Sequence, residues 1–393
     1  MADSWDFRGR LVGRRGKRGG RRRGSVLLLS VLLLVGLVSL MAFAVDLGYL
    51  YTARAELQRS ADAAALAATW QLYEDAAQAV DGVTPAEALA HARDEAMETA
   101  FRNPVARVAP VLGASDISVD CLAPVLAGGT EAMTNPASGY NSVWVRVQRK
   151  AGANGTVPLF FGRLLGVESL GMEASARALF WSNLRGFRTP ASGGNLELLP
   201  IALDRDSWLS QIEAAAGTDN YTWDPVNSVV LPGGDGLPEV NLYPQGTGSA
   251  GNRGTVDIGH GGNSTADLQR QVLHGINAND LALHGGSLEL NAQGQLLLNG
   301  DTGISAAIKD ELTQIRGQPR VIPLFDSVSG NGNNGNYTVV GFAGVRIVNV
   351  RLTGPMRSKE VVIQPAPLMI RGGIPTGGPP TTRFVYSPVV LVE

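Results

Sequence analysis

The chain has 393 residues, of which 44% are hydrophobic and 17% are charged, and it contains 49 glycines and 21 prolines. Few charges together with many glycines and prolines argue against a helical bundle and favour β-rich, loop-rich structure. At about 150 residues per domain, the length predicts two or three structural units. The single cysteine, Cys121, excludes an intramolecular disulfide. We expect it either as a small buried residue of a strand or as one half of an intermolecular bridge.

Charge is unevenly distributed along the chain. Residues 1–24 contain nine Lys or Arg and two Asp, a net charge of +7, which leaves −9 for the remainder of a chain whose total is −2. This basic, Gly-rich segment is predicted to be a disordered cytoplasmic tail, because positive charge collects on the cytoplasmic side of a membrane span. Arg/Gly-rich tails also bind nucleic acid. The apolar stretch directly behind it favours anionic lipid headgroups instead, so we expect no nucleic-acid partner.

Residues 25–45 form an uncharged stretch made mostly of Leu and Val. A helix of this length spans about 30 Å, the thickness of the hydrocarbon core of a bilayer. Ala42-Phe43-Ala44 is an Ala-x-Ala sequence of the kind that signal peptidases cut, but the apolar regions of signal peptides run only about 7–15 residues. We therefore expect a retained single-pass anchor in the lipid bilayer. A secreted adhesion module released after Ala44 is the alternative.

The helix is predicted to continue beyond the membrane to Tyr73. One stripe of small and apolar residues recurs at steps of three, four and seven, at Leu50, Leu57, Ala61, Ala64, Ala65 and Ala68. Two alternatives remain for this stripe: packing against the chain's own exported sheet, or assembly with partner subunits, including self-association. Arg23, Asp46 and Arg54 flank the membrane and are expected to fix the depth and orientation of the helix.

The following residues alternate between helix and strand signals. Thr84-Pro85-Ala86-Glu87 predicts a helix start, with Thr as N-cap, and that helix ends before Pro104. Three strands are predicted at residues 117–122, 142–150 and 172–181. The apolar segment between the last two strands, VPLFFGRLLGVESLGM, is predicted to be a short helix under the sheet.

Residues 186–195 are predicted to be a linker, and a second unit rich in strands follows. Within it, Ser264 and Asp267 predict another capped helix start. The overall fold class is therefore α+β: a transmembrane helix that continues into a long stalk helix, a small α+β domain and a β-rich C-terminal domain. The expected units are a basic tail at 1–24, a transmembrane helix at 25–45, a stalk with an α+β domain at 46–185, a β-rich exported domain at 196–370 and a Pro/Gly-rich tail at 371–393.

The signature that begins where the apolar stretch ends resembles a known family. It consists of Asp46, Gly48, Arg54, Leu57, Gln58, Ala61, Asp62, Ala63, Ala64, Ala65, Leu66 and Ala67. Together with the later V-x-V-x-V strand and PLFFGRLLGV, it is similar to TadG-like proteins of the tight-adherence (Tad, Flp pilus) assembly family, which share an N-terminal TadE/TadG-like membrane segment. The resemblance implies an inner-membrane protein with one N-terminal span and a large domain across the membrane.

Two features of related proteins are missing. Pilins of such systems carry Glu five residues into the mature chain, whereas that position, counted from Ser25, is Leu29. Some TadG proteins also have a von Willebrand A-type domain with a D-x-S-x-S metal site, and no such sequence occurs here. We therefore expect neither pilin processing nor that metal site.

The remaining motifs do not predict catalysis. Gly330 to Gly335 satisfies G-x-G-x-x-G, but a strand-like sequence follows it, so a hairpin loop is expected instead of a nucleotide site. Asp301-Thr302-Gly303 copies the aspartic-protease triplet once, and that chemistry needs two; a helix N-cap at Asp301 or Thr302 is expected. The spacing of His260, His274 and His284 matches no metal-ligand pattern. An envelope hydrolase built on Asp301, His260 and His284 is kept as the alternative function.

Together with the resemblance, which implies the pilus system, these observations predict a non-enzymatic, membrane-anchored structural or assembly protein of a Flp/Tad-type pilus or a related envelope adhesion system. Its expected partners are the lipid bilayer and other pilus-assembly or envelope proteins. No catalytic, cofactor-binding or metal-ligating residue is predicted, and no cofactor is expected. We expect the N-terminus in the cytoplasm and the C-terminal bulk exported across the inner membrane.

Overall fold

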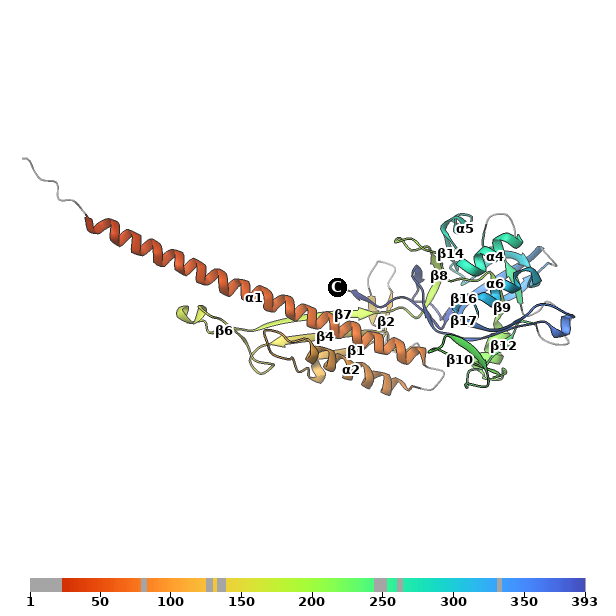
Figure 1. The fold of residues 1–393 in the computed structure, drawn as a ribbon, viewed down its shortest axis with the longest axis horizontal. Helices are drawn as coiled ribbons and strands as arrows, with labels where there is room; N and C mark the ends of the chain where they lie inside the picture. The colour runs from red at the N-terminus through yellow and green to blue at the C-terminus, as the bar shows by residue number, and fades with distance from the viewer. Residues whose placement is uncertain are drawn as a thin grey trace, which may run out of the picture.

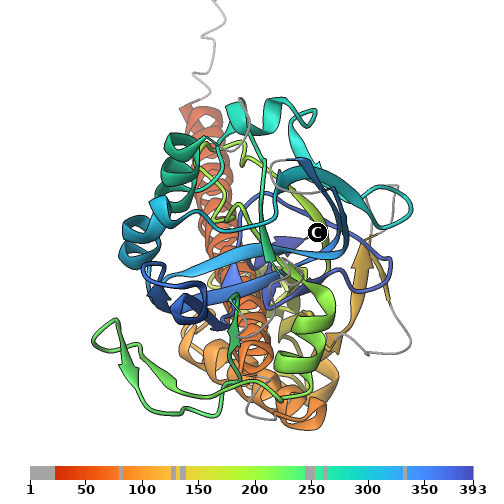
Figure 2. The same ribbon diagram turned by 90° about the vertical axis from the view of Figure 1, so that its right-hand side faces the viewer.

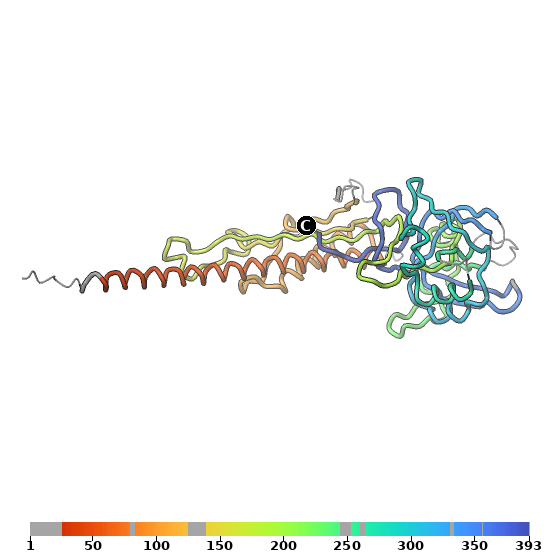
Figure 3. The backbone as a smooth tube through the Cα atoms, turned by 90° about the horizontal axis from the view of Figure 1, so that it is seen from above, coloured from red at the N-terminus to blue at the C-terminus, as the bar shows by residue number. Residues whose placement is uncertain are grey.

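A computed structural model describes residues 23–78, 83–124, 130–132, 139–243, 253–259, 264–330 and 334–392. Residues 1–22 of the expected basic tail at 1–24, and the side chain of Arg23, lie outside the described residues. The molecule is elongated, with a long helix at one end and a wider β-rich region at the other (Figures 1 and 3). Viewed along the long axis, the strands of the wide end lie in front of the helix, which recedes behind them (Figure 2).

Helix α1 runs without interruption over Arg23–Ala77, 55 residues. No proline occurs within it, and Gly36 and Gly48 have open space around them, so nothing breaks its hydrogen-bond ladder. Side chains from Val26 to Val45 are almost all exposed, including Leu40 at 71%. Beyond Asp46 one face of α1 is buried in the protein. Among the described residues, α1 is the one helix long and apolar enough to cross a membrane.

A four-stranded antiparallel sheet, the stalk sheet, packs against the second half of α1. Its strands lie in the order β1, β4, β7 and β23. The bounds are β1 Ile117–Asp120, β4 Ser142–Arg149, β7 Met172–Leu179 and β23 Val390–Val392. Helix α2, Pro85–Arg102, packs beside α1 on this sheet (Figure 1). Thr84 and Glu87 form its capping box, which confirms the predicted helix start.

The apolar segment between β4 and β7 does not lie under the sheet. Its two short strands, β5 (Val157–Pro158) and β6 (Ser169–Leu170), pair with each other around the 3-10 helix η2 (Gly162–Leu165). This tip (residues 157–170) projects from the stalk sheet along α1 toward its apolar half (Figure 1). The segment does contain a short 3-10 helix, but its predicted position under the sheet is wrong, because Leu164 and Leu165 are exposed.

Five strands form a closed ring within the distal region, residues 201–369. Strands β17, β15, β13, β9 and β16 are hydrogen-bonded in this order, and β16 pairs back onto β17, which closes the ring. The bounds are β9 Ile201–Asp204, β13 Arg253–Val256, β15 Leu296–Asp301, β16 Pro319–Ser329 and β17 Gly335–Arg351. Strands β18 (Glu360–Pro365) and β12 (Val240–Asn241) extend the sheet from β17. The predicted α+β class with a β-rich C-terminal region is thus confirmed.

Short helices cover one face of this distal sheet. Leu268 and Val272 of α4 and Leu312 of α6 share a core with Ile322 and Val345 of the ring. The predicted N-cap of α4 is confirmed, because the Ser264 side chain accepts a hydrogen bond from the Asp267 N–H. The helices here are α3 Arg205–Trp208, a π-turn Leu209–Glu213, α4 Thr265–His274, α5 Ala278–Ala282, η4 Ala306–Ile308, α6 Lys309–Gln314 and η6 Met356–Ser358.

The last residues of the chain return to the stalk. The expected loose tail at 371–393 instead contains strands that pair with four different partners: β20 with β8, β21 with β17, β22 with β19 and β23 with β7. Strand β8 includes the first residues of the expected linker. The remaining elements are η1 Ala114–Asp116, β2 Leu122–Pro124, β3 Thr130–Ala132, β8 Leu184–Arg188, β10 Tyr221–Asp224, β11 Val229–Pro232, β14 Ser287–Glu289, β19 Leu368–Met369, β20 Gly373–Pro375, β21 Thr382–Arg383 and β22 Val385–Tyr386.

Candidate membrane-boundary and assembly site

The small-residue stripe of α1 faces the interior of the chain. Its five residues from Leu57 onward are all 0% exposed: Leu57, Ala61, Ala64, Ala65 and Ala68. They share one core with three alanines of α2 at four-residue spacing, Ala92, Ala96 and Ala100, and with Val143 and Val145 of β4. Methyl side chains on both helices allow close helix packing. The chain's own sheet and α2 therefore occupy the stripe, and we do not propose self-association through it.

Asp46 lies where the exposed apolar half of α1 meets the packed half, and the residue is only 6% exposed. It accepts hydrogen bonds from the backbone N–H groups of Phe160 at 2.8 Å, Phe161 at 3.0 Å and Gly162 at 2.7 Å. These three amides belong to the tip and stand at the start of η2. Asp46 thus joins α1 to a loop 114 residues further along the chain.

The tip is shaped to reach this carboxylate. A Cβ atom on Gly162 would lie 2.6 Å from Leu159 Cδ1 and 2.7 Å from the Val167 carbonyl oxygen, so a side chain does not fit there. Gly166 ends η2 in the left-handed region at φ +80°, as glycine does most readily. The rings of Tyr49 on α1 and Phe160 meet edge to face with centroids 5.2 Å apart. The tip is therefore bound to α1 by both polar and aromatic contacts.

The other residues expected at the membrane boundary are less constrained. Arg54 is exposed on α1, and the side chain of Arg23 lies outside the described residues. A neighbour on the same helix makes the tertiary contact instead: Glu56 accepts a hydrogen bond of 2.7 Å from the backbone N–H of Ala106. Ala106 follows α2 and has φ +47°, so this bond supports a strained turn.

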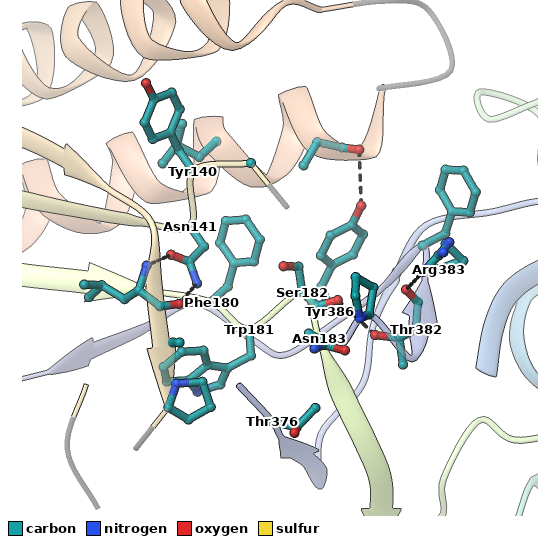
Figure 4. A pocket seen from close by; sticks show the side chains of 18 of the residues that line it. Tyr140, Asn141, Phe180, Trp181, Ser182, Asn183, Thr376, Thr382, Arg383 and Tyr386 are labelled. Carbon is teal, nitrogen blue, oxygen red and sulfur yellow. Dashed lines mark hydrogen bonds between the residues drawn. The ribbon is translucent and has the colours of Figure 1, made fainter. Parts of the chain in front are cut away.

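The C-terminal end of α1 meets the returning chain at a cavity of about 610 Å³ (Figure 4). The Tyr386 hydroxyl donates to the carbonyl oxygen of Ala76 in the last turn of α1, 3.2 Å away. The Tyr386 ring packs edge to face on Tyr73 and Phe180, with centroids 5.3 and 5.7 Å apart. Burial raises the pKa of the Tyr386 phenol well above its usual value. The phenol therefore stays protonated. Its hydrogen bond and ring contacts hold the last turn of α1 against the returning chain.

Two of the polar residues that line this cavity, Asn141 and Thr382, bond to the main chain. Asn141 exchanges two hydrogen bonds with the main chain of Leu122, at 2.7 and 2.9 Å (Figure 4). Thr382 donates to the Ser182 carbonyl and accepts from the Leu184 N–H. Because these groups already have main-chain partners, the cavity has the character of a structural joint between stalk and distal region.

Of the candidate catalytic residues within the described part of the chain, Asp301 lies on β15 and His284 follows α5. In that described part, no group of three or more His, Cys, Asp or Glu residues could hold a metal. Asp301 ends β15, where its carbonyl accepts a hydrogen bond from the Tyr337 hydroxyl. The predicted N-cap at Asp301 or Thr302 is wrong, because Ser305 caps the next helix. His284 is half-buried, which lowers its pKa; His260 lies outside the described residues.

The glycine-rich run at Gly330 joins two paired strands. Ser329 of β16 faces Asn336 of β17 in an antiparallel register, so the chain reverses between them. Residues 331–333 lie outside the described residues. The expected hairpin is thus present, and the strand–helix context of a dinucleotide site is not.

Comparison with known families identifies one segment of the chain. Residues 24–80 match the family model described as putative Flp pilus-assembly TadE/G-like. This range covers α1, including the apolar half, Asp46 and the alanine stripe, and it confirms the resemblance over that segment. No curated protein and no solved structure gives a significant match.

Proposed function

We propose that this chain is a membrane-anchored structural protein of a Flp/Tad-type pilus or a related envelope adhesion system. The match of residues 24–80 to the TadE/G-like pilus-assembly model supports a role in that process. The observation that carries the proposal is the continuity of α1. One helix exposes an apolar surface over residues 26–45 and then buries its next turns in a folded domain, with no hinge between them.

This continuity fixes the folded part relative to the bilayer. A helix that leaves the membrane without a break transmits its orientation, and the Asp46 bonds to the tip brace it at the boundary. With the basic N-terminal segment in the cytoplasm, the stalk and the distal region stand on the exported side of the inner membrane. Other pilus-assembly or envelope proteins are the proposed partners, and they meet the exported surface by protein–protein contact without catalysis.

Fractionation and N-terminal sequencing of the full chain test the anchor. The chain with its intact N-terminus should stay in the membrane fraction after carbonate extraction. Alkaline carbonate releases peripheral proteins but does not extract a span of 21 uncharged residues from the bilayer. A mature protein that starts at Val45 in the soluble fraction would instead show the secreted module.

Photo-crosslinking in cells tests the assembly role. We would place the crosslinking amino acid at Val226 and Leu297, which are exposed at 89% and 71% in the distal region, and at Leu57 as a buried control. Crosslinks from the exposed positions to pilus or envelope proteins, absent at Leu57, are expected. Wild-type piliation and adhesion after deletion of the whole chain would contradict the role.

Asp46→Leu tests the proposed boundary role of Asp46. Leucine removes the carboxylate and lengthens the apolar stretch, so the span should shift and pilus or adhesion phenotypes should weaken. Unchanged insertion depth together with unchanged phenotype would remove Asp46 from the mechanism.

A further inference from the structure

We propose that the tip, residues 157–170, dips its apolar side chains into the surface of the same bilayer that α1 crosses. This proposal rests on the proposed membrane anchor and adds a second contact between the exported domain and lipid. The exposed side chains of the tip thus contact the outer leaflet of the bilayer at the level where α1 leaves the membrane.

The exposed side chains of the tip are unusually apolar. Leu164 and Leu165 are 80% and 82% exposed, and Phe160 and Phe161 are 59% and 40% exposed. Val167 and Leu170 extend the same surface at 44% and 40%. Exposed apolar side chains gathered in one short loop mark a site that binds a protein, a ligand or a membrane. Exposed Arg163 stands among these residues and supplies a guanidinium for a lipid phosphate.

The position of the tip favours lipid over a protein partner as the contact of these side chains. Asp46 is the first charged residue after the uncharged stretch, and it binds the tip amides directly. Phe43 and Val45, one turn or less before Asp46, are themselves 62% and 52% exposed on α1. Any depth of insertion that buries these two side chains in the bilayer brings the tip to the same boundary. The tip also projects from the stalk sheet toward the apolar half of α1 (Figure 1).

Many backbone N–H groups of the tip have hydrogen-bond partners within the chain, as insertion into lipid requires. Asp46 satisfies the N–H groups of residues 160–162. Within the tip, the N–H groups of Leu159, Leu164, Gly166 and Val167 donate to the carbonyls of Glu168, Phe161, Arg163 and Gly162. Non-helical backbone enters the apolar region at a large cost unless its polar groups are paired. This loop pairs these seven N–H groups with its own chain.

Fluorescence of the full chain in lipid vesicles tests the proposal. In a Cys121→Ala background, an environment-sensitive dye would be attached at Leu164→Cys or Leu165→Cys. Val38→Cys reports the anchor, and Val226→Cys, at the β10–β11 turn of the distal region, is the exposed control. Vesicles would contain phosphatidylethanolamine and phosphatidylglycerol, with or without lipids that carry a quencher in the acyl chain.

The expected result is blue-shifted emission and strong quenching at positions 38, 164 and 165, with neither effect at 226. Quenching at 38 alone would overturn the tip proposal and leave the anchor intact. Quenching at none of the positions would overturn the anchor as well, so the two failures are distinguishable. A blue shift at 164 and 165 that needs added membrane proteins would assign the tip to a protein partner and equally overturn the lipid contact.

Discussion

At the scale of single residues, the Asp46 carboxylate does more than mark the end of an apolar stretch. Its two oxygens accept three backbone N–H bonds from a loop distant in sequence, and its burial shields those bonds from water. Hydrogen bonds to a charged acceptor contribute more than neutral ones, about 1.5–3 kcal/mol each against about 1. One side chain therefore sets where the tip docks on α1.

Asp46→Asn tests that assignment. Asparagine offers one acceptor oxygen and no charge, so the three amides lose part of their bonding, and tip docking should weaken by about 1.5–3 kcal/mol. Hydrogen exchange of residues 160–162 measures this directly and should accelerate. Asp62→Asn is the matched control, because Asp62 on the same helix accepts from Gln58 and not from the tip. Equal protection in Asp46→Asn and wild type would show that the carboxylate does not hold the loop.

The raised pKa of Tyr386 predicts that the folded chain loses stability at alkaline pH. Burial raises the pKa of this phenol and also that of Tyr73, which packs against it. The unfolded chain releases these protons at about pH 10 while the folded chain keeps them. Stability is therefore fully present below pH 10 and falls as the pH rises above it. Denaturation of the detergent-solubilised chain between pH 8 and 11 should show this fall.

Tyr386→Phe should flatten the alkaline dependence and lower stability at neutral pH by about 1 kcal/mol, because the hydrogen bond to Ala76 is lost. Tyr51→Phe is the control, since that side chain is 73% exposed on α1. A steep alkaline loss that persists unchanged in Tyr386→Phe would locate the effect in other buried tyrosines, such as Tyr337, whose pKa burial raises to about 12.

Contacts between residues close in sequence could be predicted, whereas contacts between residues far apart in sequence could not. The capping box of Thr84 and Glu87 lies within four residues, so its geometry follows from spacing alone. The partner of Asp46 is a set of backbone amides, which carry no side-chain signature, 114 residues away. The N-cap at Asp301 failed for a related reason. The β15–β13 pairing extends to Asp301, which leaves Ser305 to begin the next helix.

At the scale of elements, the contact between α1 and α2 depends on side-chain size. Ala64 is completely buried in a core that contains alanines of both helices. Ala64→Leu should push the helices apart and destabilise the stalk by about 1–3 kcal/mol, since overpacking forces backbone shifts. Chemical denaturation of the full chain in detergent measures this loss. Ala55→Leu, on the exposed face, should be close to neutral. Equal stability of the two variants would show that the interface tolerates a wider spacing.

Periodicity predicted the stripe but not its partner, because small residues suit an intramolecular sheet and a neighbouring subunit equally well. The structure places α2 and β4 there. The tip shows a second limit of sequence-based prediction: apolar composition does not reveal whether a segment is buried in the protein. Its sequence is as apolar as a core segment, and composition cannot distinguish a protein interior from another apolar environment. The predicted helix under the sheet failed on that ambiguity, and only the fold reveals that these side chains point outward.

At the scale of the whole molecule, the last described strand, β23, pairs with β7 of the stalk sheet. The returning segment passes from the distal region to the stalk sheet through strands of two or three residues each. Strands this short show no alternation, and the glycines and prolines before them predicted a loose tail. The α+β class was predictable because it depends on long periodic segments. The connection between the two regions was not, because it depends on pairings between residues about 200 positions apart, such as Leu179 with Val390.

Truncation of the C-terminus tests whether this return holds the distal region to the stalk. A chain that stops before Val385 loses β22 with its pairing to β19, the Tyr386 bond to Ala76, the aromatic contacts with Tyr73 and Phe180, and β23. Removing a buried aromatic side chain alone costs about 3–5 kcal/mol. The junction should then open, and limited proteolysis should cut near residues 181–190 while the distal ring stays intact.

A chain that stops before Val390 is the matched control, since it keeps Tyr386 and loses only β23. It should be cut at an intermediate rate, because the edge strand is gone and the aromatic closure of α1 remains. Both truncated chains should still fractionate with the membrane, as α1 is untouched. If the shorter chain resists the protease as well as the full chain does, the stalk and the distal region are joined by the 180–190 connection alone, and the C-terminal strands merely cover it.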